Sequence, residues 1–149
     1  MIVYLDSSVL ARSYLSDEEG HEQAIALLED PDIVAVTGKW TRIEVSGALL
    51  RAARTGRHAT GEQDLLAMLD GDLAEHGRVS ELTAPAADVE QKALELVRQH
   101  ALRTLDTWHL ALASLTVPAL AAPEKEAIAF ASRDEAQATV AEQLGFKRI

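Results

Sequence analysis

The sequence predicts an α/β fold built around a mostly parallel sheet. Short apolar segments typical of strands alternate with longer amphipathic segments typical of helices. Strands that are joined through helices must be mostly parallel, because a parallel crossover needs about a dozen residues and a helix supplies them. With 149 residues and 48% hydrophobic content, the chain is expected to form one domain over residues 1–149, with a full core and no room for a second domain.

Four apolar runs and one short C-terminal run are the strand candidates. Each is short and is bounded by polar residues, glycine or proline. The predicted strands are Ile2–Asp6, Asp32–Thr37, Val79–Ala84, Glu126–Ser132 and, as an edge strand, Phe146–Ile149.

Seven amphipathic segments are predicted as helices, over residues 7–15, 20–30, 39–55, 61–76, 87–101, 102–115 and 134–145. Ser7 or Ser8 is the predicted N-cap of the first helix, and Thr60 that of the fourth. Gly56 and Gly145 are the predicted residues just beyond the third and the last helix, since glycine readily adopts the left-handed conformation of that position.

The charge of the chain is unevenly distributed. A net charge of −10 argues against non-specific binding of nucleic acid, because phosphate contacts require lysine and arginine. Residues 38–58 nevertheless carry five basic side chains against one acid, a net +4, namely Lys39, Arg42, Arg51, Arg54 and Arg57 against Glu44. Two interpretations remain open: a solvated helix face that keeps the protein in solution, or a track for a phosphate backbone.

Composition also excludes several classes of protein. The chain has no cysteine, which rules out disulfides and thiolate metal sites, so any metal must bind to carboxylates or histidines. It has no apolar run of 18 residues or more, and its N-terminus lacks the pattern of a signal peptide. We therefore expect a cytoplasmic protein without a membrane segment.

Four acids occupy related positions in the predicted fold. Asp6 follows the first strand, Glu44 lies in the helix after the second, Asp106 opens a helix, and Asp134 follows the fourth strand. Ligands of open parallel sheets bind outside the carboxyl ends of the strands. Each acid alone has a simpler explanation as a helix cap or a surface side chain. Together they would repel one another unless a cation neutralised them or their pKa values rose.

A hard cation is the simpler solution. Oxygen ligands without cysteine favour Mg²⁺ or Mn²⁺ over zinc, and His109 is interpreted as a packed histidine rather than a ligand. A carboxylate-held Mg²⁺ suits the hydrolysis of phosphodiester bonds. Arg51 and Arg54 could then guide a phosphate backbone towards the acids, since Glu44 and Arg51 are predicted on one face of the same helix.

Four sequence blocks resemble those of the PIN-domain ribonucleases and, among them, the VapC-type toxins of bacterial toxin–antitoxin pairs. YLDSSVLAR is similar to the first-strand motif of the family, with Asp6 and Ser8. TRIEVSGALLRA resembles the T/S-x-x-E block that contains Glu44. LRTLDTWHLALAS is similar to the block of the third acid, Asp106, and FASRDEAQATVAEQLGF to the final strand and helix, with Asp134.

The resemblance implies a three-layer α/β/α sandwich with about five mostly parallel strands. It further implies an endoribonuclease that depends on Mg²⁺ or Mn²⁺, forms a homodimer and is inhibited by a cognate, VapB-like antitoxin. Asp6 and Asp106 are the first expected ligands, followed by Glu44 and Asp134, with Ser8 and Ser132 orienting an acid or a water.

The sequence departs from the family pattern in two places. Ser132 stands where threonine is more common, which keeps the hydroxyl. Residues 115–127, with Pro118 and Pro123, are predicted as an unusually long connection before the fourth strand.

An aspartate that becomes phosphorylated and a non-catalytic binding surface are the two alternatives to the nuclease. A phosphatase of the first kind would need a second Asp two residues after Asp6, where the chain has Ser8. A response-regulator receiver would need a lysine near a later strand, and no lysine lies near Asp106 or Asp134. Loss of the acids would favour a non-catalytic binding module with the same fold. All four acids are present, which favours the nuclease.

Overall fold

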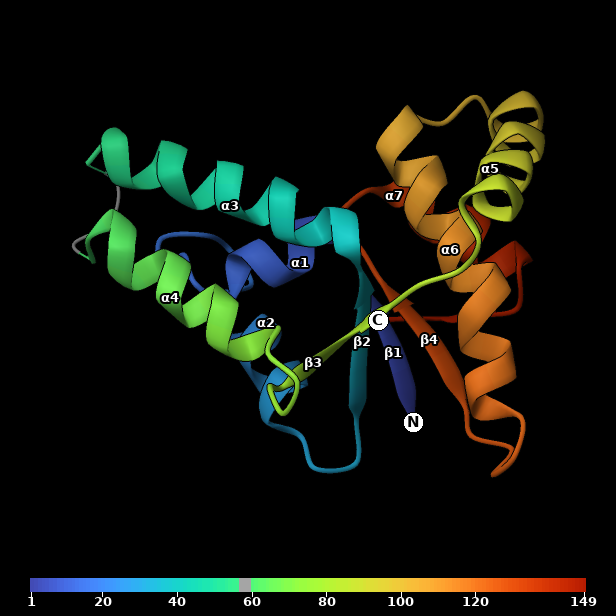
Figure 1. The fold of residues 1–149 in the computed structure, drawn as a ribbon, viewed down its shortest axis with the longest axis horizontal. Coiled ribbons are helices and arrows are strands. Elements are labelled where there is room, and N and C mark those ends of the chain that lie inside the picture. Colours follow the sequence, from blue (N-terminus) through green and yellow to red (C-terminus); the bar gives the residue numbers. More distant parts are fainter. Residues whose placement is uncertain (57–59) are drawn as a thin grey trace.

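Five parallel strands form one sheet in the centre of the molecule (Figure 1). The computed structural model describes residues 1–56 and 60–149, so Arg57 of the basic segment lies outside the described residues. The sheet order is β3-β2-β1-β4-β5, and every neighbouring pair is parallel. The strands are β1 Ile2–Leu5, β2 Val34–Gly38, β3 Val79–Leu82, β4 Ile128–Ala131 and β5 Lys147–Arg148. The predicted fold class and all five strands are confirmed.

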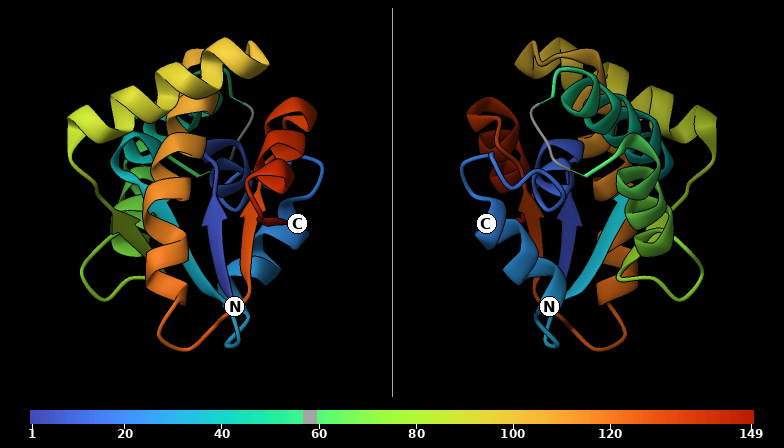
Figure 2. Two further views of the ribbon diagram at one scale, coloured as in Figure 1. Left: turned by 90° about the vertical axis from the view of Figure 1, so that its right-hand side faces the viewer. Right: turned by 90° about the vertical axis from the view of Figure 1, so that its left-hand side faces the viewer.

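Helices cover both faces of the sheet, as the two side views show (Figure 2). One core joins the sheet to α1–α4, and a second joins it to α5–α7. The helices are α1 Ser7–Arg12, α2 His21–Glu29, α3 Lys39–Arg54, α4 Glu62–Asp72, α5 Ala86–His100, α6 Thr104–Ala121 and α7 Glu135–Gln143. Within the described ranges, no helix is both long and apolar enough to cross a membrane.

β1 is buried on both faces. Val3 and Leu5 belong to the core under α1–α4, whereas Ile2 and Tyr4 belong to the core under α5–α7. A strand that is covered on both sides has no solvent face, which explains why its sequence is an unbroken apolar run rather than an alternating one.

The chain changes direction across the sheet at β1. It leaves β1 towards β2 and β3 on one side and later returns to β4 on the other, so the carboxyl end of β1 is a topological switch point. Two hydrogen bonds hold this corner: the backbone N–H of Asp6 donates to the Ala131 carbonyl at 3.0 Å, and the Thr37 hydroxyl donates to the Leu5 carbonyl at 2.7 Å. Asp6 is thereby fixed between β2 and β4.

Both predictions of an N-cap were wrong. Asp6, not Ser7 or Ser8, caps α1, because its backbone is extended and its carboxylate accepts a hydrogen bond from the Ser8 N–H. α4 begins after Gly61 rather than after Thr60. Gly56 and Gly145 do follow their helices with positive φ angles of 69° and 92°, as expected.

The prediction of a connection over residues 115–127 was wrong for residues 115–121, which are helical. α6 continues to Ala121 and contains Pro118. A proline inside a helix removes one hydrogen bond and costs about 3 kcal/mol. Val117 and Ala121 on either side of it are buried in the α5–α7 core, and this packing offsets the cost.

We expect the substitution Gly38→Ala to lower the stability of the protein by about 1–3 kcal/mol, as overpacking of a core does. A Cβ at this position would lie 2.6 Å from Cδ2 of Leu112 and 2.8 Å from the hydroxyl of Tyr4, and both side chains are buried. Chemical denaturation measures the change.

Gly71→Ala in α4 is the matched control, because a Cβ there meets no atom within 4 Å. It should raise the stability by about 0.5–1 kcal/mol, since alanine favours the helical backbone. Equal effects of the two substitutions would contradict the close packing of Gly38 against Tyr4.

Candidate active site

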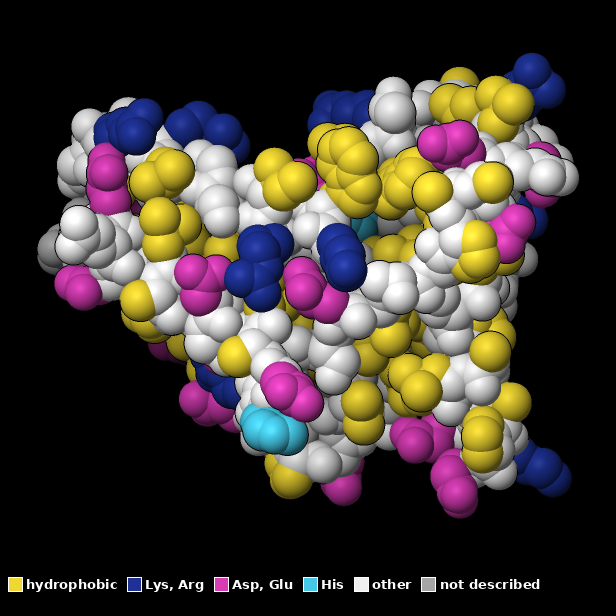
Figure 3. All heavy atoms as spheres, viewed as in Figure 1, with side chains coloured by type: hydrophobic (Ala, Val, Ile, Leu, Met, Phe, Trp, Pro, Cys, Tyr) yellow, Lys and Arg dark blue, Asp and Glu magenta, His cyan; other side chains and the backbone are white. Residues whose placement is uncertain are grey.

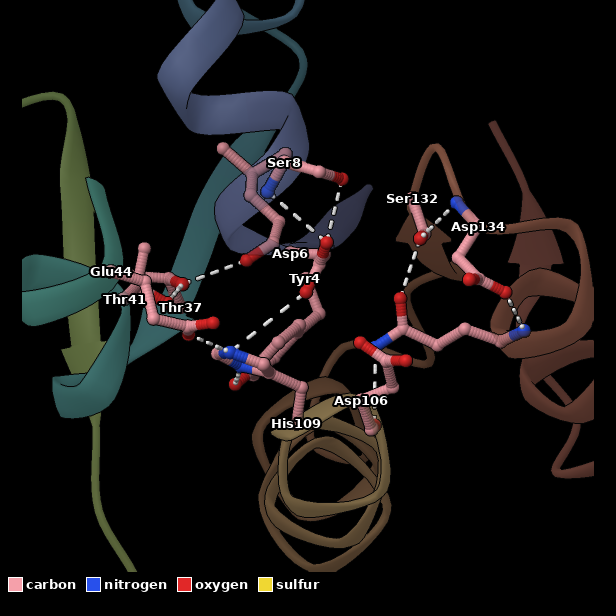
Figure 4. Close-up of polar contacts among 12 residues, drawn as sticks. Tyr4, Asp6, Ser8, Thr37, Thr41, Glu44, Asp106, His109, Ser132 and Asp134 are labelled. Carbon is pink, nitrogen blue, oxygen red and sulfur yellow. Dashed lines mark hydrogen bonds and ion pairs between the residues drawn. The ribbon is translucent and has the colours of Figure 1, made fainter. Parts of the chain in front are cut away.

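Three of the predicted acids meet at the switch point of the sheet. Asp6, Asp106 and Asp134 line one surface pocket of about 300 Å³, together with Ser8. Asp6 follows β1, Asp106 lies in the first turn of α6, and Asp134 follows β4 (Figure 4). The sheet topology therefore brings together three carboxylates that are far apart in the sequence.

Asp6 is the most buried of these acids, with 4% of its surface exposed. Its Oδ2 accepts two hydrogen bonds from Ser8, at 3.1 Å from the backbone N–H and at 2.6 Å from the hydroxyl. The same Ser8 hydroxyl accepts the backbone N–H of Arg133 at 3.2 Å. Ser8 thus orients Asp6 and connects it to the turn after β4, while Oδ1 of Asp6 points to His109, whose Nε2 is 3.8 Å away.

Glu44 reaches the site through His109. The Nε2 atom of His109 lies 2.7 Å from Oε2 of Glu44, and the imidazole is 99% buried between Glu44 and Tyr4 (Figure 4). Glu44 sits on α3 beside the pocket and is not among the residues that line it. The fourth acid is therefore held next to Asp6 by a histidine that contacts both.

A chain of hydrogen bonds fixes the orientation of His109. The Tyr4 hydroxyl lies 2.9 Å from Nδ1 of His109, and Nε2 of the same ring faces Glu44. Burial, followed by the charges of Asp6 and Glu44, raises the pKa of Tyr4 well above its ordinary value, so this hydroxyl keeps its proton. In the neutral form of His109, Tyr4 donates to Nδ1, and the single imidazole proton lies on Nε2, where it is donated to Glu44.

Asp106 is the acid of this cluster whose pKa is raised. Its partial burial, and then the negative charges of Asp6 and Asp134, raise the pKa of its carboxyl above the ordinary value of 3.8. Arg103 and His109 act in the opposite direction but do not cancel this effect. The three carboxylates are therefore not neutralised by the protein itself.

Asp134 has a second role as the N-cap of α7. Its Oδ1 accepts the backbone N–H of Gln137 at 3.0 Å, and its own N–H donates to the Ser132 hydroxyl at 2.9 Å. Ser132 in turn donates to the side-chain oxygen of Gln137, which is fully buried. The Gln137 amide then donates to the Asp106 carbonyl at 3.1 Å, so that one side chain connects the starts of α6 and α7.

The two arginines predicted to contact RNA occupy different surroundings. Arg54 donates to Glu62 of α4 at 3.1 Å, whereas Arg51 lies on the side of α3 that faces α1 and lines a pocket there. Lysine and arginine side chains are visible along the top of the molecule, over the end of α3 and beyond the notch that separates it from α5 and α6 (Figure 3).

The oxygen donors fit a divalent cation of the Mg²⁺ type. Among the described residues, no three acids or histidines already lie close enough together to hold a metal ion alone. Mg²⁺ does not require such a cage, because it commonly binds through one or two carboxylates and keeps several waters or substrate oxygens. Asp6 and Asp106 could supply those carboxylates. Burial, followed by the charges of Asp6 and Asp134, raises the pKa of Asp106, and a bound cation would favour its ionised form.

Asp106→Asn should stabilise the folded protein in the absence of metal by a few degrees of melting temperature at neutral pH. The raised pKa of Asp106 means that its ionised form is less favourable in the folded than in the unfolded state. This gain in stability should be complete above the pKa that Asp106 has in the folded protein. It should vanish below about pH 3.8, where the Asp106 carboxyl is protonated in both the folded and the unfolded state.

Thermal unfolding in EDTA at several pH values measures this gain. Glu90→Gln changes an exposed acid of α5 that does not line the acidic pocket, so it serves as the control and should show no such dependence. A destabilised Asp106→Asn protein at neutral pH would contradict the repulsion among the three acids.

Comparison with known proteins agrees with this geometry. The family model of the PIN domain matches residues 3–143. The chain is 36% identical over 112 residues to "Ribonuclease VapC45" of Mycobacterium tuberculosis (strain CDC 1551 / Oshkosh) and to "Ribonuclease VapC49" of Mycobacterium tuberculosis (strain ATCC 25618 / H37Rv). Each alignment covers 75% of this chain and 74% of the relative. The chain therefore belongs to the PIN domain family and, within it, to the VapC-type proteins.

Proposed function

We propose that this protein is a Mg²⁺-dependent endoribonuclease that acts as the toxin of a toxin–antitoxin pair in the cytoplasm. The observation that supports it best is the meeting of Asp6, Asp106 and Asp134 at the switch point of the sheet, where burial and then the two other carboxylates raise the pKa of Asp106. The ribonucleases VapC45 and VapC49, to which the chain is similar, support RNA as the substrate.

The side chains have distinct roles in this proposal. Asp6 and Asp106 bind the cation, and Glu44 and Asp134 complete the negative site from either side, directly or through water. A bound Mg²⁺ (or Mn²⁺ in its place) supplies a Lewis acid that polarises the phosphodiester and makes a water more acidic. Ser8 holds Asp6 in one orientation, and Ser132 does the same for the turn that carries Asp134.

His109 is a positioning residue in this proposal. Its proton on Nε2 is donated to Glu44, which leaves the other oxygen of that carboxylate free to face the cation or a water. Outer groups of this kind typically change metal affinity or activity by about 10- to 100-fold.

The proposed partners are a cognate VapB-like antitoxin and a second copy of the chain. A basic antitoxin segment that places an arginine or lysine among the three aspartates would replace the cation and block the site. The surface of α3 supports a homodimer, since Trp40 and Ile43 expose 46% and 67% of their surface there.

The absence of three preassembled ligands among the described residues favours one alternative, a PIN-like module that binds RNA without cleaving it. Metal-dependent cleavage distinguishes the two functions.

Purified protein should cleave total cellular RNA with Mg²⁺ or Mn²⁺ and lose this activity in EDTA. Asp6→Asn should lower the rate by at least about 100-fold, because the amide keeps the shape of the side chain and removes a negative ligand. Mapping of the cut ends by sequencing measures both effects and identifies the target.

Asp32→Asn is the control for this experiment, since Asp32 precedes β2 at the opposite end of the strands. Cleavage that survives both EDTA and Asp6→Asn would contradict the metal mechanism. Binding of RNA without cleavage under every condition would support the binding module instead.

His109→Leu should lower kcat by about 10- to 100-fold and weaken Mg²⁺ binding, because Glu44 loses the donor that orients it. His109→Gln should restore part of both, since its amide can still donate to a carboxylate. Calorimetric titration with Mg²⁺ and steady-state cleavage kinetics separate the two effects.

RNA affinity in EDTA is the internal control for His109. It should not change, because His109 is buried and reaches no substrate surface. If both variants lost activity only in proportion to their unfolded fraction, His109 would have a purely structural role.

A further inference from the structure

A second pocket adjoins the acidic one and has the opposite charge. It has a volume of about 440 Å³ and lies between α1, the second half of α3 and the turn after β4. Ser8 and Arg133 line both pockets, so the two are continuous. The charged side chains of this second pocket are Arg12, Arg51, Arg133 and Glu18.

Three arginines around one acid make this pocket cationic in an otherwise acidic protein. The acidic pocket contains three aspartates and two arginines, and the neighbouring pocket reverses that balance. The sign of the charge therefore changes at Arg133, within one continuous depression. A ligand that binds a cation at one end and offers an anionic group at the other would match both pockets.

Arg12 is incompletely paired inside the protein. Its Nε atom is buried and has no hydrogen-bond partner among the described residues. Gly20 leaves room for the guanidinium, because a Cβ there would lie 2.5 Å from Nη1. Burial, and next the charge of Arg133, lower the pKa of Arg12. An anion that entered the pocket would relieve both effects.

The other two arginines are available for an anion to different degrees. Arg133 donates through Nη1 to Glu18 at 2.6 Å, which leaves the rest of its planar fork of donors. Arg51 forms no ion pair with any residue in the described part of the chain, and its guanidinium lies over Gly47, whose missing side chain leaves it room.

We propose that Arg12, Arg51 and Arg133 bind a backbone phosphate of the RNA strand next to the phosphate that is cleaved. This inference rests on the proposed nuclease function. It states where the RNA strand runs beyond the acidic pocket. Arginine is suited to this contact because its fork of donors matches phosphate oxygens. The contact reads no base, so it supports affinity and register rather than sequence specificity.

Binding without cleavage tests the pocket separately from the nuclease activity. The probe is a fluorescein-labelled single-stranded oligoribonucleotide of mixed sequence, bound to Asp6→Asn protein in EDTA and followed by fluorescence anisotropy over a range of salt concentrations. Added to that background, Arg12→Gln, Arg51→Gln and Arg133→Gln should each weaken binding on the order of five- to tenfold. Each should also reduce the slope of log K against log salt by about 0.7.

Two further variants guard against effects on folding. Arg98→Gln, an exposed arginine of α5, should change neither affinity nor slope. Glu18→Gln should tighten binding severalfold, because Glu18 competes with phosphate for Arg133, and a gain of affinity cannot come from a damaged fold.

The outcomes distinguish this proposal from the nuclease function. RNA binding with an unchanged salt slope in all three arginine variants would overturn the phosphate pocket even if the protein cleaves RNA. Arginine variants that bind RNA normally but lose binding of an acidic peptide would assign the pocket to a protein partner and overturn the proposal as well. If the arginine variants reduced the slope of log K against log salt but the unsubstituted protein never cleaved RNA, the phosphate pocket would be supported and the nuclease function rejected.

Discussion

The position of β1 between two parallel neighbours is the constraint on which the rest of the structure depends. Parallel pairing directs the carboxyl ends of all five strands to the same edge of the sheet. The reversal of direction at β1 then opens that edge, with Asp6 on one side and the turn after β4 on the other. Because β1 is covered by helices on both faces, the corner after Leu5 cannot shift without disturbing two cores. A carboxylate attached to so rigid a corner has a fixed place.

Electrostatics then divides this edge into two regions. At the switch point, burial and then the charges of Asp6 and Asp134 raise the pKa of Asp106, so its ionised form lowers the stability of the fold. Arginines from α1, α3 and the turn after β4 gather beside them, and the buried Nε of Arg12 lacks a partner among the described residues. Natural proteins keep such unfavourable arrangements mainly at functional sites.

Most of the fold could be predicted from the sequence, because the buried strands form apolar runs too strong to misread. The extent of α6 could not, since the local signal of Pro118 is outweighed by packing of Val117 that only the folded chain provides. The four acids stood out through their positions relative to the strands. The connection of His109 to the site had no comparable signal, because its partners Tyr4 and Glu44 lie 105 and 65 residues away along the chain.

The hydrogen bonds from Tyr4 through His109 to Glu44 join three elements that are synthesised at different times. β1 and the start of α3 leave the ribosome first, but the histidine that orients Glu44 is more than a hundred residues behind Tyr4. A nascent chain therefore has no oriented Glu44 until α6 has been made and has docked on the sheet. For the proposed ribonuclease, this order of assembly would delay a competent site until nearly the whole chain has been translated.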